Sequence, residues 1–440
     1  MPDTLESTVT LPLPPGPEQP MVLDIDLPSQ QAISRLLTQY GDIFRVRIPK
    51  RKQATYIVTN PDAVKQILVS NHSNYIKGRG FERVKMLLGN GIIVSDGDFW
   101  RRQRTMIQPA FSRKHIHRMN AMMQQVTQQL TPRWQHKADN HEALDISTEM
   151  SEFALELILR ALIADDLDML IQTCGENPFT FLTADPARNL AVAMKFRQLA
   201  PLIQGVIDRR RKHHEHHSDL LDALMYATDK QGKPMTDKEL MDEVMTMIIA
   251  GHETSAGTLN WVWYELARHP QIEARLASEA NSMVHDGGIK IDDVTKLAYT
   301  KQVINETLRL YPPVWLFTRK AVADDSLAGF HIPAGTDIFL SPFFSHRDPA
   351  CWDDAETFNP ERFANDGKHL KHKYAFIPFS AGSRRCIGEY FSYIEMQTHL
   401  AILSTQFSLS LLPGQHIEID PGINLRTKNR IMMTVHRRQG

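Results

Sequence analysis

Apolar residues recur at spacings of three and four over most of the chain between about residues 61 and 310. This spacing places apolar side chains on one face of a helix, so the region is predicted to be mainly α-helical. The most apolar helical run extends from Val244 to Trp261, and a further helix is predicted from about Glu389 to Leu403.

Strand-like patterns lie towards both ends of the chain. The short runs Ile43 to Ile48 and Thr55 to Thr59 are predicted to pair with each other. The segment Leu327 to Phe344 contains a turn at Pro333-Ala334-Gly335-Thr336 between two runs of β-forming residues. Alternating apolar residues predict more strands from Phe407 to Val435.

The chain is predicted to form one large domain. Prolines crowd the first twenty residues, so residues 1–30 are expected to be an extended leader and residues 31–440 the domain itself. No internal repeat and no Gly/Ser-rich linker divides the sequence. The predicted fold class is mainly α with small β-sheets (α+β), with a sheet assembled from both ends of the chain.

Composition excludes several classes of function. Lys and Arg number 50 and Asp and Glu 51, so no basic excess suggests nucleic acid as a partner. The cysteines Cys174, Cys351 and Cys386 are too few for a disulfide framework, which fits a reducing compartment. No apolar stretch approaches the length of a membrane span, and residues 1–30 lack the order of a signal peptide. A cytoplasmic location is expected.

The sequence around Cys386 carries the clearest chemical signal. Cys386 lies between Gly382 and Gly388 and follows Phe379 and Arg384, in the order F-x-x-G-x-R-x-C-x-G. A metal-binding sulfur must be a thiolate, which needs nearby cations and backbone N–H donors, and glycines let the backbone approach a cofactor. The alternative is a buried, inert cysteine in a glycine-containing turn.

This spacing resembles the haem-binding loop of the cytochrome P450 family. The resemblance implies the P450 fold and haem b, iron protoporphyrin IX, with Cys386 as the axial metal ligand. It also implies that Phe379, Arg384 and Gly388 belong to the cofactor-binding residues. A colourless, haem-free helical protein with a structural Cys386 is the corresponding alternative.

A second motif, Ala250-Gly251-His252-Glu253-Thr254, lies within the apolar helical run. A glycine inside a helix costs roughly 1 kcal/mol relative to alanine, so Gly251 needs a packing or functional reason. Thr254 either bonds back to the Ala250 carbonyl or leaves that carbonyl open to a ligand. The resemblance implies that Ala250 and Gly251 lie against the cofactor and that Glu253 and Thr254 deliver protons to bound dioxygen.

Trp100 and Arg104 lie four residues apart, on one face of a predicted helix. An indole N–H and a guanidinium are suitable donors to the two propionates of haem. The motif W-x-x-x-R matches the propionate-binding helix of the family, and the resemblance adds Arg319 and Arg384 as further propionate partners. The alternative is an ordinary basic helix on a solvated face.

Three charged residues are predicted to be structural. Glu306 and Arg309 lie three residues apart on a predicted helix, a spacing that usually gives only a solvated ion pair. The resemblance implies instead that they join Arg362 in a buried network that braces the cysteine loop. Buried charges need such pairing.

Two clusters of basic residues each have two interpretations. Arg101, Arg102, Arg113, Lys114, Arg118 and Arg385 form either a dock for an acidic electron donor or ordinary surface charge. The histidines of residues 213–217 could bind a metal, but the high charge of that segment favours a solvated connection between helices.

The resemblance therefore predicts a haem-thiolate monooxygenase that inserts one atom of O2 into a C–H bond of a hydrophobic small molecule, such as a fatty acid, terpenoid or polyketide. Electrons are expected from a separate ferredoxin or flavodoxin with an NAD(P)H-dependent reductase. The alternatives are a peroxide-driven thiolate-haem enzyme and a haem-based gas sensor without turnover. The resemblance also implies, by position in the family, which apolar residues line the substrate pocket: Met247, Ala250, Val314, Leu316, Phe317 and Ile423.

Overall fold

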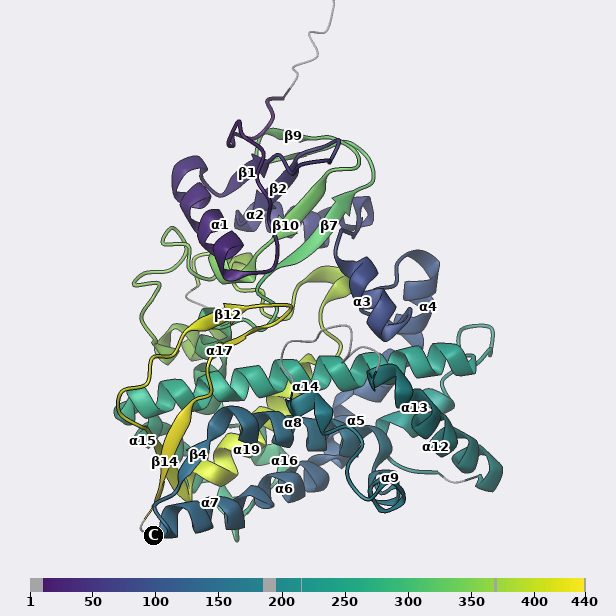
Figure 1. Cartoon of the computed structure of the whole chain (residues 1–440), viewed down its shortest axis with the longest axis vertical. Coiled ribbons are helices and arrows are strands. Elements are labelled where there is room, and N and C mark those ends of the chain that lie inside the picture. Colours follow the sequence, from purple (N-terminus) through teal and green to yellow (C-terminus); the bar gives the residue numbers. More distant parts are fainter. Residues whose placement is uncertain (1–10, 185–194, 215, 368–369, 439–440) are drawn as a thin grey trace, which may run out of the picture.

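Helix α14 (Asp237–Arg268) crosses the middle of the molecule in the computed structural model (Figure 1). The structure describes residues 11–184, 195–214, 216–367 and 370–438. A capping box starts α14, because the Thr236 side chain accepts from the Glu239 N–H and the Glu239 side chain accepts from the Thr236 N–H. The predicted run Val244 to Trp261 is the interior of this helix, which packs most extensively against α8 (Ile146–Ile163).

The largest sheet confirms the prediction that both ends of the chain contribute strands. Its order is β1 (Ile43–Val46), β2 (Thr55–Val58), β10 (Asp337–Leu340), β7 (Phe317–Ala321) and β3 (Tyr75–Lys77). The pair β1–β2 is antiparallel, as expected for neighbouring runs, whereas β2 and β10 are parallel. All four residues of β2 and of β10 are buried, as central strands require.

The described part of the proline-rich leader, residues 11–26, lies along this sheet. The Arg45 N–H donates to the Pro15 carbonyl, and the Met21 N–H donates to the Arg47 carbonyl. A Cβ on Gly16 would lie 1.9 Å from the Arg45 carbonyl oxygen, so only glycine permits this approach. The segment is extended, as predicted; the division into a leader of residues 1–30 and a domain of residues 31–440 stays a prediction.

Most of the remaining helices form a body below this sheet in Figure 1, whereas the two helices nearest the amino terminus lie beside the sheet. The other helices are α1 (Leu27–Tyr40), α2 (Pro61–Lys65), α3 (Phe81–Leu88), α4 (Gly97–Ile107), α5 (Arg113–Arg118), α6 (Asn120–Gln128), α7 (Leu130–Asp139), α9 (Asp166–Cys174), α10 (Phe181–Ala184), α12 (Ala200–His213), α13 (Leu220–Met225), α15 (Pro270–Asn281), α16 (Ile291–Val294), α17 (Ala298–Leu310), α18 (Pro342–Ser345) and α19 (Glu389–Ser404). Short turns of other helix types are η1 (Gln66–Ser70), η2 (His72–Asn74), η3 (Gln108–Phe111), η4 (Pro360–Gly367), η5 (Lys373–Ala375) and η6 (Gly382–Arg384).

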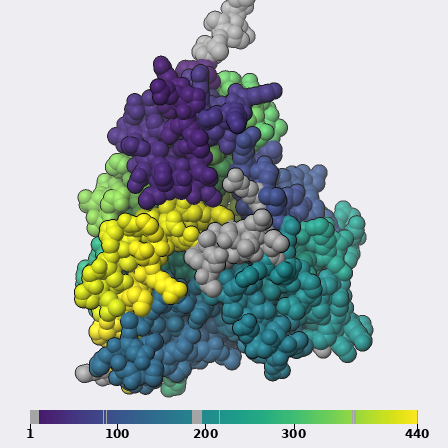
Figure 2. All heavy atoms as spheres, in the orientation of Figure 1, coloured from purple at the N-terminus to yellow at the C-terminus, as the bar shows by residue number. Residues whose placement is uncertain are grey.

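The remaining strands are β4 (Ala143–Asp145), β5 (Val284–His285), β6 (Gly288–Ile289), β8 (Asp325–Leu327), β9 (Phe330–Ile332), β11 (Phe407–Leu411), β12 (Ile419–Pro421), β13 (Leu425–Thr427) and β14 (Met432–Arg437). The order β11-β14-β4 makes a second sheet, and three two-stranded ribbons complete the β structure. The predicted strands in the tail and the predicted helix after Cys386 are both present. The carboxyl-terminal segment, yellow in Figure 2, lies along one side of the molecule below the sheet. The fold is mainly α with small sheets, as predicted.

Candidate functional site

Cys386 lies in a tight loop directly before helix α19. Its N–H donates to the Phe379 carbonyl over 2.9 Å, which closes the loop across its base. Gly382 has a φ of 66°, and a Cβ there would lie 1.9 Å from the Leu68 carbonyl oxygen. Glycine is therefore required twice over at this position, for its backbone conformation and for contact with η1.

The surroundings of the Cys386 sulfur suit a bound metal better than a free thiol. Burial raises the pKa of the Cys386 thiol, which keeps it protonated when it has no metal. Its side chain is nevertheless accessible to solvent. The backbone N–H groups of Gly388 and Glu389 bond to the sulfur, and the Arg104 charge lies near it, all favouring the thiolate. A metal cation bound to the sulfur would shift the equilibrium from the thiol to the thiolate.

Arg384 and Trp100 meet on the same side of the loop. The Arg384 guanidinium lies over the Trp100 ring at 3.7 Å from its centroid and donates to the Ser95 carbonyl over 2.8 Å. Arg384 also forms an ion pair with Asp96. Arg104, one turn after Trp100 on α4, donates to the Arg385 carbonyl over 2.9 Å. The structure thus brings Arg384, from the cysteine loop, together with Trp100 and Arg104, the pair predicted from the W-x-x-x-R motif.

Arg319 joins the same cluster from β7. It is buried, and its Nη1 donates to the Thr318 carbonyl over 2.8 Å. Burial, followed by the neighbouring Arg384 charge, lowers the pKa of Arg319 to about 10. Burial is also the main reason why the pKa of Arg384 falls to about 10.

Lys77 is a further member that the sequence analysis missed. It ends β3, which pairs with β7 so that Lys77 lies opposite Arg319. Burial lowers the pKa of Lys77 well below its ordinary value; the charges of Arg319 and Arg384 lower it further, and Asp96 opposes the shift. No motif marks Lys77, so its position became evident only from the pairing of β3 with β7.

The donor set of this cluster fits haem. The cationic side chains of Lys77, Arg319 and Arg384 lie near the Asp96 carboxylate, and the Arg104 charge lies near Arg384. Such an excess of buried positive charge is costly unless anions balance it. Haem carries two propionates, and its iron takes a thiolate, so the cationic cluster and Cys386 supply both kinds of partner.

On α14, the acid and the alcohol of the second motif have different partners. The Thr254 hydroxyl donates to the Ala250 carbonyl over 2.7 Å, one of the two arrangements considered from the sequence. Asn424, between β12 and β13, donates from its side chain to the Glu253 carboxylate. Glu253 therefore contacts the carboxyl-terminal segment, and the predicted proton-delivery role of the pair is not tested by this geometry.

Packing against α8 explains why residue 251 is a glycine. A Cβ on Gly251 would lie 2.7 Å from Cγ1 and Cδ1 of Ile158 on α8. The Cα therefore faces the neighbouring helix, which explains a glycine at this point of α14. Its contact with a cofactor stays a prediction.

Glu306, Arg309 and Arg362 form a buried network. Arg309 donates twice to Glu306, over 2.7 and 2.8 Å, and both side chains are fully buried. Nε of Arg362 lies 3.4 Å from Oε1 of Glu306. Arg309 also donates to the carbonyls of His346, Ala355 and Thr357. The network ties α17 to the coil before η4, which precedes the cysteine loop in sequence.

Half of the predicted basic surface is already paired with carboxylates. Arg101 pairs with Asp98, Arg102 with Asp229 and Glu239, and Arg385 with Glu389. Arg113, Lys114 and Arg118 are exposed, and no ion pair joins them to a carboxylate in the described part of the chain. Arg113 lies over the Tyr390 ring on α19, 5.2 Å from its centroid. The remaining basic surface is therefore close to the cysteine loop.

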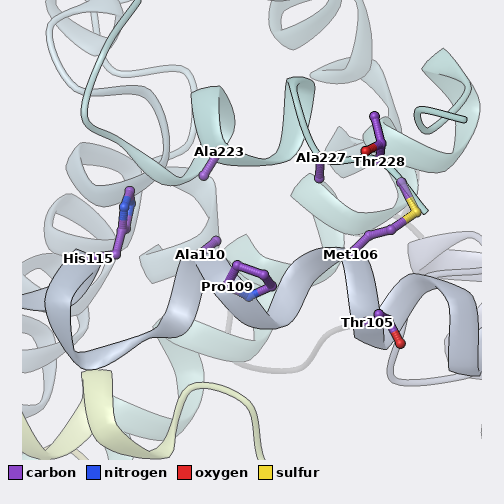
Figure 3. Close-up of a pocket in the computed structure, with 8 residues that line it drawn as sticks. All are labelled: Thr105, Met106, Pro109, Ala110, His115, Ala223, Ala227 and Thr228. Atoms are coloured by element: carbon purple, nitrogen blue, oxygen red, sulfur yellow. The ribbon is translucent and has the colours of Figure 1, made fainter. Parts of the chain in front are cut away.

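The predicted substrate-pocket residues differ in exposure. Met247 is buried, Val314 and Ile423 are exposed, and Ala250, Leu316 and Phe317 are partly buried. A separate pocket of about 280 Å³ opens between α4, η3, α5 and α13 (Figure 3). None of the predicted site residues lines it. Its lining consists of Thr105, Met106, Pro109, Ala110, His115, Ala223, Ala227 and Thr228.

The histidine-rich segment gives no sign of a metal site. His213 ends α12, and His216 lies 3.7 Å from Asp222, while Glu215 lies outside the described residues. Among the residues that the structure describes, no group of three or more His, Cys, Asp or Glu side chains could hold a metal ion. None of the described helices has both the length and the hydropathy that crossing a bilayer requires.

Known proteins and one family profile match this sequence over most of its length. The profile of the family described as Cytochrome P450 matches residues 14–187 and 177–434. Cyclooctatin synthase of Streptomyces melanosporofaciens is 32% identical over 88% of this chain and 87% of its own length. Pentalenene oxygenase of Streptomyces avermitilis is 30% identical over 87% of each. The protein LUTEIN DEFICIENT 5 of Arabidopsis thaliana is 30% identical over 92% of this chain and 73% of its own length.

Solved structures share the fold. The heme domain of cytochrome P450DA superposes with a TM-score of 0.86, at 23% identity over 98% of this chain and 97% of its own. A retinoic acid-bound cyanobacterial CYP120A1 superposes with a TM-score of 0.85, at 24% identity over 98% and 100%. At these identities the likeness concerns the fold alone.

Proposed function

Since this chain belongs to the cytochrome P450 family of haem-dependent monooxygenases, we propose that it hydroxylates a C–H bond of a terpenoid. Two similar relatives have names that denote the oxygenation of unsaturated carbon compounds, pentalenene oxygenase and cyclooctat-9-en-7-ol 5-monooxygenase. The apolar positions expected at the substrate pocket suit a hydrocarbon of this kind better than a charged substrate.

The observation that carries the proposal is Cys386 beside a cluster of unbalanced cations. In the proposed site Cys386 is the iron ligand of haem b, and Trp100, Arg104, Arg319 and Arg384 bind the propionates. Lys77 adds a fifth partner on the same side. Phe379 and Gly388 are proposed to shape the loop, and Ala250 and Gly251 would lie against the haem when it is bound. Haem, when bound, supplies the activation of dioxygen.

Glu253 and Thr254 are proposed to supply the protons that the chemistry of bound haem would consume. The Thr254 hydroxyl donates to the Ala250 carbonyl, and its oxygen can still accept a hydrogen bond from another donor. Glu253 supplies an ionisable group whose position Asn424 fixes. Together they provide the acid and the alcohol that a proton path needs.

Electrons are proposed to come from an acidic ferredoxin or flavodoxin that docks on Arg113, Lys114 and Arg118. These side chains are exposed, and Arg113 lies over the ring of Tyr390, four residues after Cys386. NAD(P)H would serve the reductase of that partner. A reducing, cytoplasmic location agrees with three cysteines that are all free of disulfides.

The carbon monoxide spectrum of the reduced protein tests the haem-thiolate centre. The wild-type protein should show the band of thiolate-ligated haem, and Cys386→Ser should lose it. A colourless wild-type preparation, or a band typical of histidine ligation, would overturn the proposal. Substrate class is then tested by screening terpene hydrocarbons and fatty acids for the absorption change that follows displacement of axial water.

Proton handling is tested with Thr254→Ala and the matched substitution Thr258→Ala. Both hydroxyls donate to the carbonyl four residues earlier, over 2.7 and 2.8 Å, so both variants lose the same kind of helix contact. Only Thr254→Ala should divert reducing equivalents from NAD(P)H to peroxide. Equal peroxide yields in the two variants would remove Thr254 from the proposed path, and peroxide-supported turnover without reductase-supported turnover would favour a peroxide-driven enzyme.

A further inference from the structure

Two adjacent carboxyl groups of α14 hold the segment between α3 and α4. Asp242 accepts from the Asn90 N–H and Glu243 accepts from the Ile92 N–H, each over 2.9 Å. Glu243 is 1% exposed, and no ion pair joins it to a cation in the described part of the chain. A carboxyl group is expensive to bury, so these contacts need a function that compensates for the cost.

Close packing also fixes this segment against α14. A Cβ on Gly91 would lie 2.1 Å from Oγ1 of Thr246, one turn after Asp242 and Glu243. It would also lie 2.8 Å from the Asp242 carbonyl oxygen, so only glycine permits this approach. The Thr246 hydroxyl is held in turn, because it donates to that same carbonyl over 2.7 Å. The backbone of residues 90–92 is therefore fixed both by hydrogen bonds and by contact.

The fixed backbone leads directly into the cationic cluster. The Gly91 carbonyl accepts from the N–H groups of Val94 and Ser95, over 3.0 and 3.1 Å, which closes a tight turn. The Ser95 carbonyl then accepts from Arg384 of the cysteine loop over 2.8 Å, and Asp96 forms an ion pair with the same guanidinium. A continuous path of backbone and hydrogen bonds therefore joins α14 to Arg384.

The direction of the Arg384 guanidinium depends on fixed acceptors. Burial lowers the pKa of Arg384 to about 10; Asp96 opposes this shift, and the charges of Arg101 and Arg104 add to it. Because like charges repel the guanidinium, the acceptors Ser95 and Asp96 determine where its N–H groups point. A binding group is placed most accurately when its own partners are held rigidly.

We propose that Glu243 and Asp242 are positioning residues for Arg384. They fix the turn of residues 90–95, whose Ser95 carbonyl sets the direction in which the guanidinium presents its remaining N–H groups to a haem propionate. The inference rests on the proposed function, because Arg384 is a propionate partner there. Both carboxyl groups act through the backbone of the turn and need no contact with haem.

Haem release from the holoprotein tests the role of Glu243. Glu243→Leu should speed the transfer of haem to an acceptor globin roughly three- to tenfold, the effect of losing one buried hydrogen bond. Glu243→Gln should stay close to the wild type. Burial raises the pKa of Glu243 to about 8, so it is largely uncharged at neutral pH, and an amide oxygen can equally accept from Ile92. The propionate bending band in the resonance Raman spectrum should shift in Glu243→Leu but not in Glu243→Gln. A general loss of stability would leave this band unchanged.

Asp242→Ala and Lys238→Ala form a matched pair at the neighbouring contact. Lys238 donates to the Asp242 carboxylate over 2.7 Å, and its own side chain is 78% exposed. Both variants lose this ion pair, but only Asp242→Ala loses the bond to the Asn90 N–H. Haem release should therefore accelerate several-fold in Asp242→Ala and stay at the wild-type rate in Lys238→Ala.

A double variant tests whether the effect passes through Arg384. Arg384→Lys loses the planar guanidinium, so Glu243→Leu should add little to haem release in that background. Full additivity, an unchanged propionate band, or equal release from Asp242→Ala and Lys238→Ala would show that the positioning role is wrong. If Glu243→Leu fails to fold, the Asp242 and Lys238 variants still decide. A wild-type protein without the thiolate-haem band would instead refute the proposed function.

Discussion

Single residues show how far spacing alone could predict the site. Trp100, Arg104 and Arg384 were identified because each lies in a motif of fixed spacing, and the structure brings them together. Lys77 lies in no motif, and it lies opposite Arg319 only because β3 pairs with β7. This pairing joins segments far apart in the chain, which no local pattern encodes.

The cationic cluster predicts an unusual pair of effects for Lys77→Met. Burial, followed by the charges of Arg319 and Arg384, disfavours a charged Lys77 in the haem-free protein, so its removal should raise the free energy of unfolding. The holoprotein should instead lose haem several-fold faster, because one propionate partner is gone. Urea unfolding of the haem-free protein and haem transfer to an acceptor globin measure the two effects.

Lys85→Met provides the control for this prediction. Lys85 is an exposed lysine on α3, so its replacement removes the same charge from the surface. Neither effect should appear in this variant. If Lys77→Met and Lys85→Met lose haem at the same rate, Lys77 is not part of the haem site.

Whole elements were predicted more securely than their ends. The apolar run Val244 to Trp261 identified α14, but the helix begins at Asp237 and ends at Arg268. Its start was marked in the sequence by Thr236 and Glu239, the pattern of a capping box, which periodicity does not detect. Strand β3 was missed because it has only three residues and one of them, Ile76, is exposed.

The contact between α14 and α8 predicts the effect of Gly251→Ala. The new methyl group would lie 2.7 Å from Ile158, so the variant should lose about 1–3 kcal/mol of stability through overpacking. Ile158→Ala on its own should also destabilise the protein, by about 2–5 kcal/mol. The double variant should be more stable than the sum of the two effects predicts, because the cavity receives the methyl group. Thermal or urea unfolding provides the comparison.

Gly205→Ala on α12 is the corresponding control. A Cβ on Gly205 has no other atom within 4 Å, so helix propensity alone should act there. We expect a gain of roughly 0.5–1 kcal/mol at that position. If the double variant loses as much stability as Gly251→Ala and Ile158→Ala lose in sum, the packing explanation for Gly251 is wrong.

At the scale of the whole molecule, both ends of the chain build one sheet. The sequence predicted this from the positions of the strand-like runs, and the register of β2 with β10 confirms it. The path of residues 11–26 along β1 was not predictable, because prolines signal an extended chain without indicating what it packs against.

The packed leader predicts that Gly16→Val releases it from the sheet. A side chain at residue 16 would collide with the Arg45 carbonyl, so the hydrogen bonds of Pro15 and Met21 to the β1 region should break. Limited proteolysis should then cut within residues 11–26 at a much higher rate, and the uncovered strand edge should promote self-association seen by light scattering. Glu18→Ala, at an exposed leader position, should change neither measurement. Unchanged proteolysis of Gly16→Val would show that the leader contact is weak.

The parallel pairing of β2 with β10 also has a consequence during biosynthesis. A ribosome must translate most of the chain after residues 55–58 emerge before residues 337–340 can reach them. At elongation rates of about 5–20 residues per second, the nascent amino-terminal hairpin waits on the order of tens of seconds for its neighbour. Throughout that delay the backbone N–H and C=O groups along one edge of β2 have no partner strand. We therefore expect a chaperone to bind this hairpin during translation.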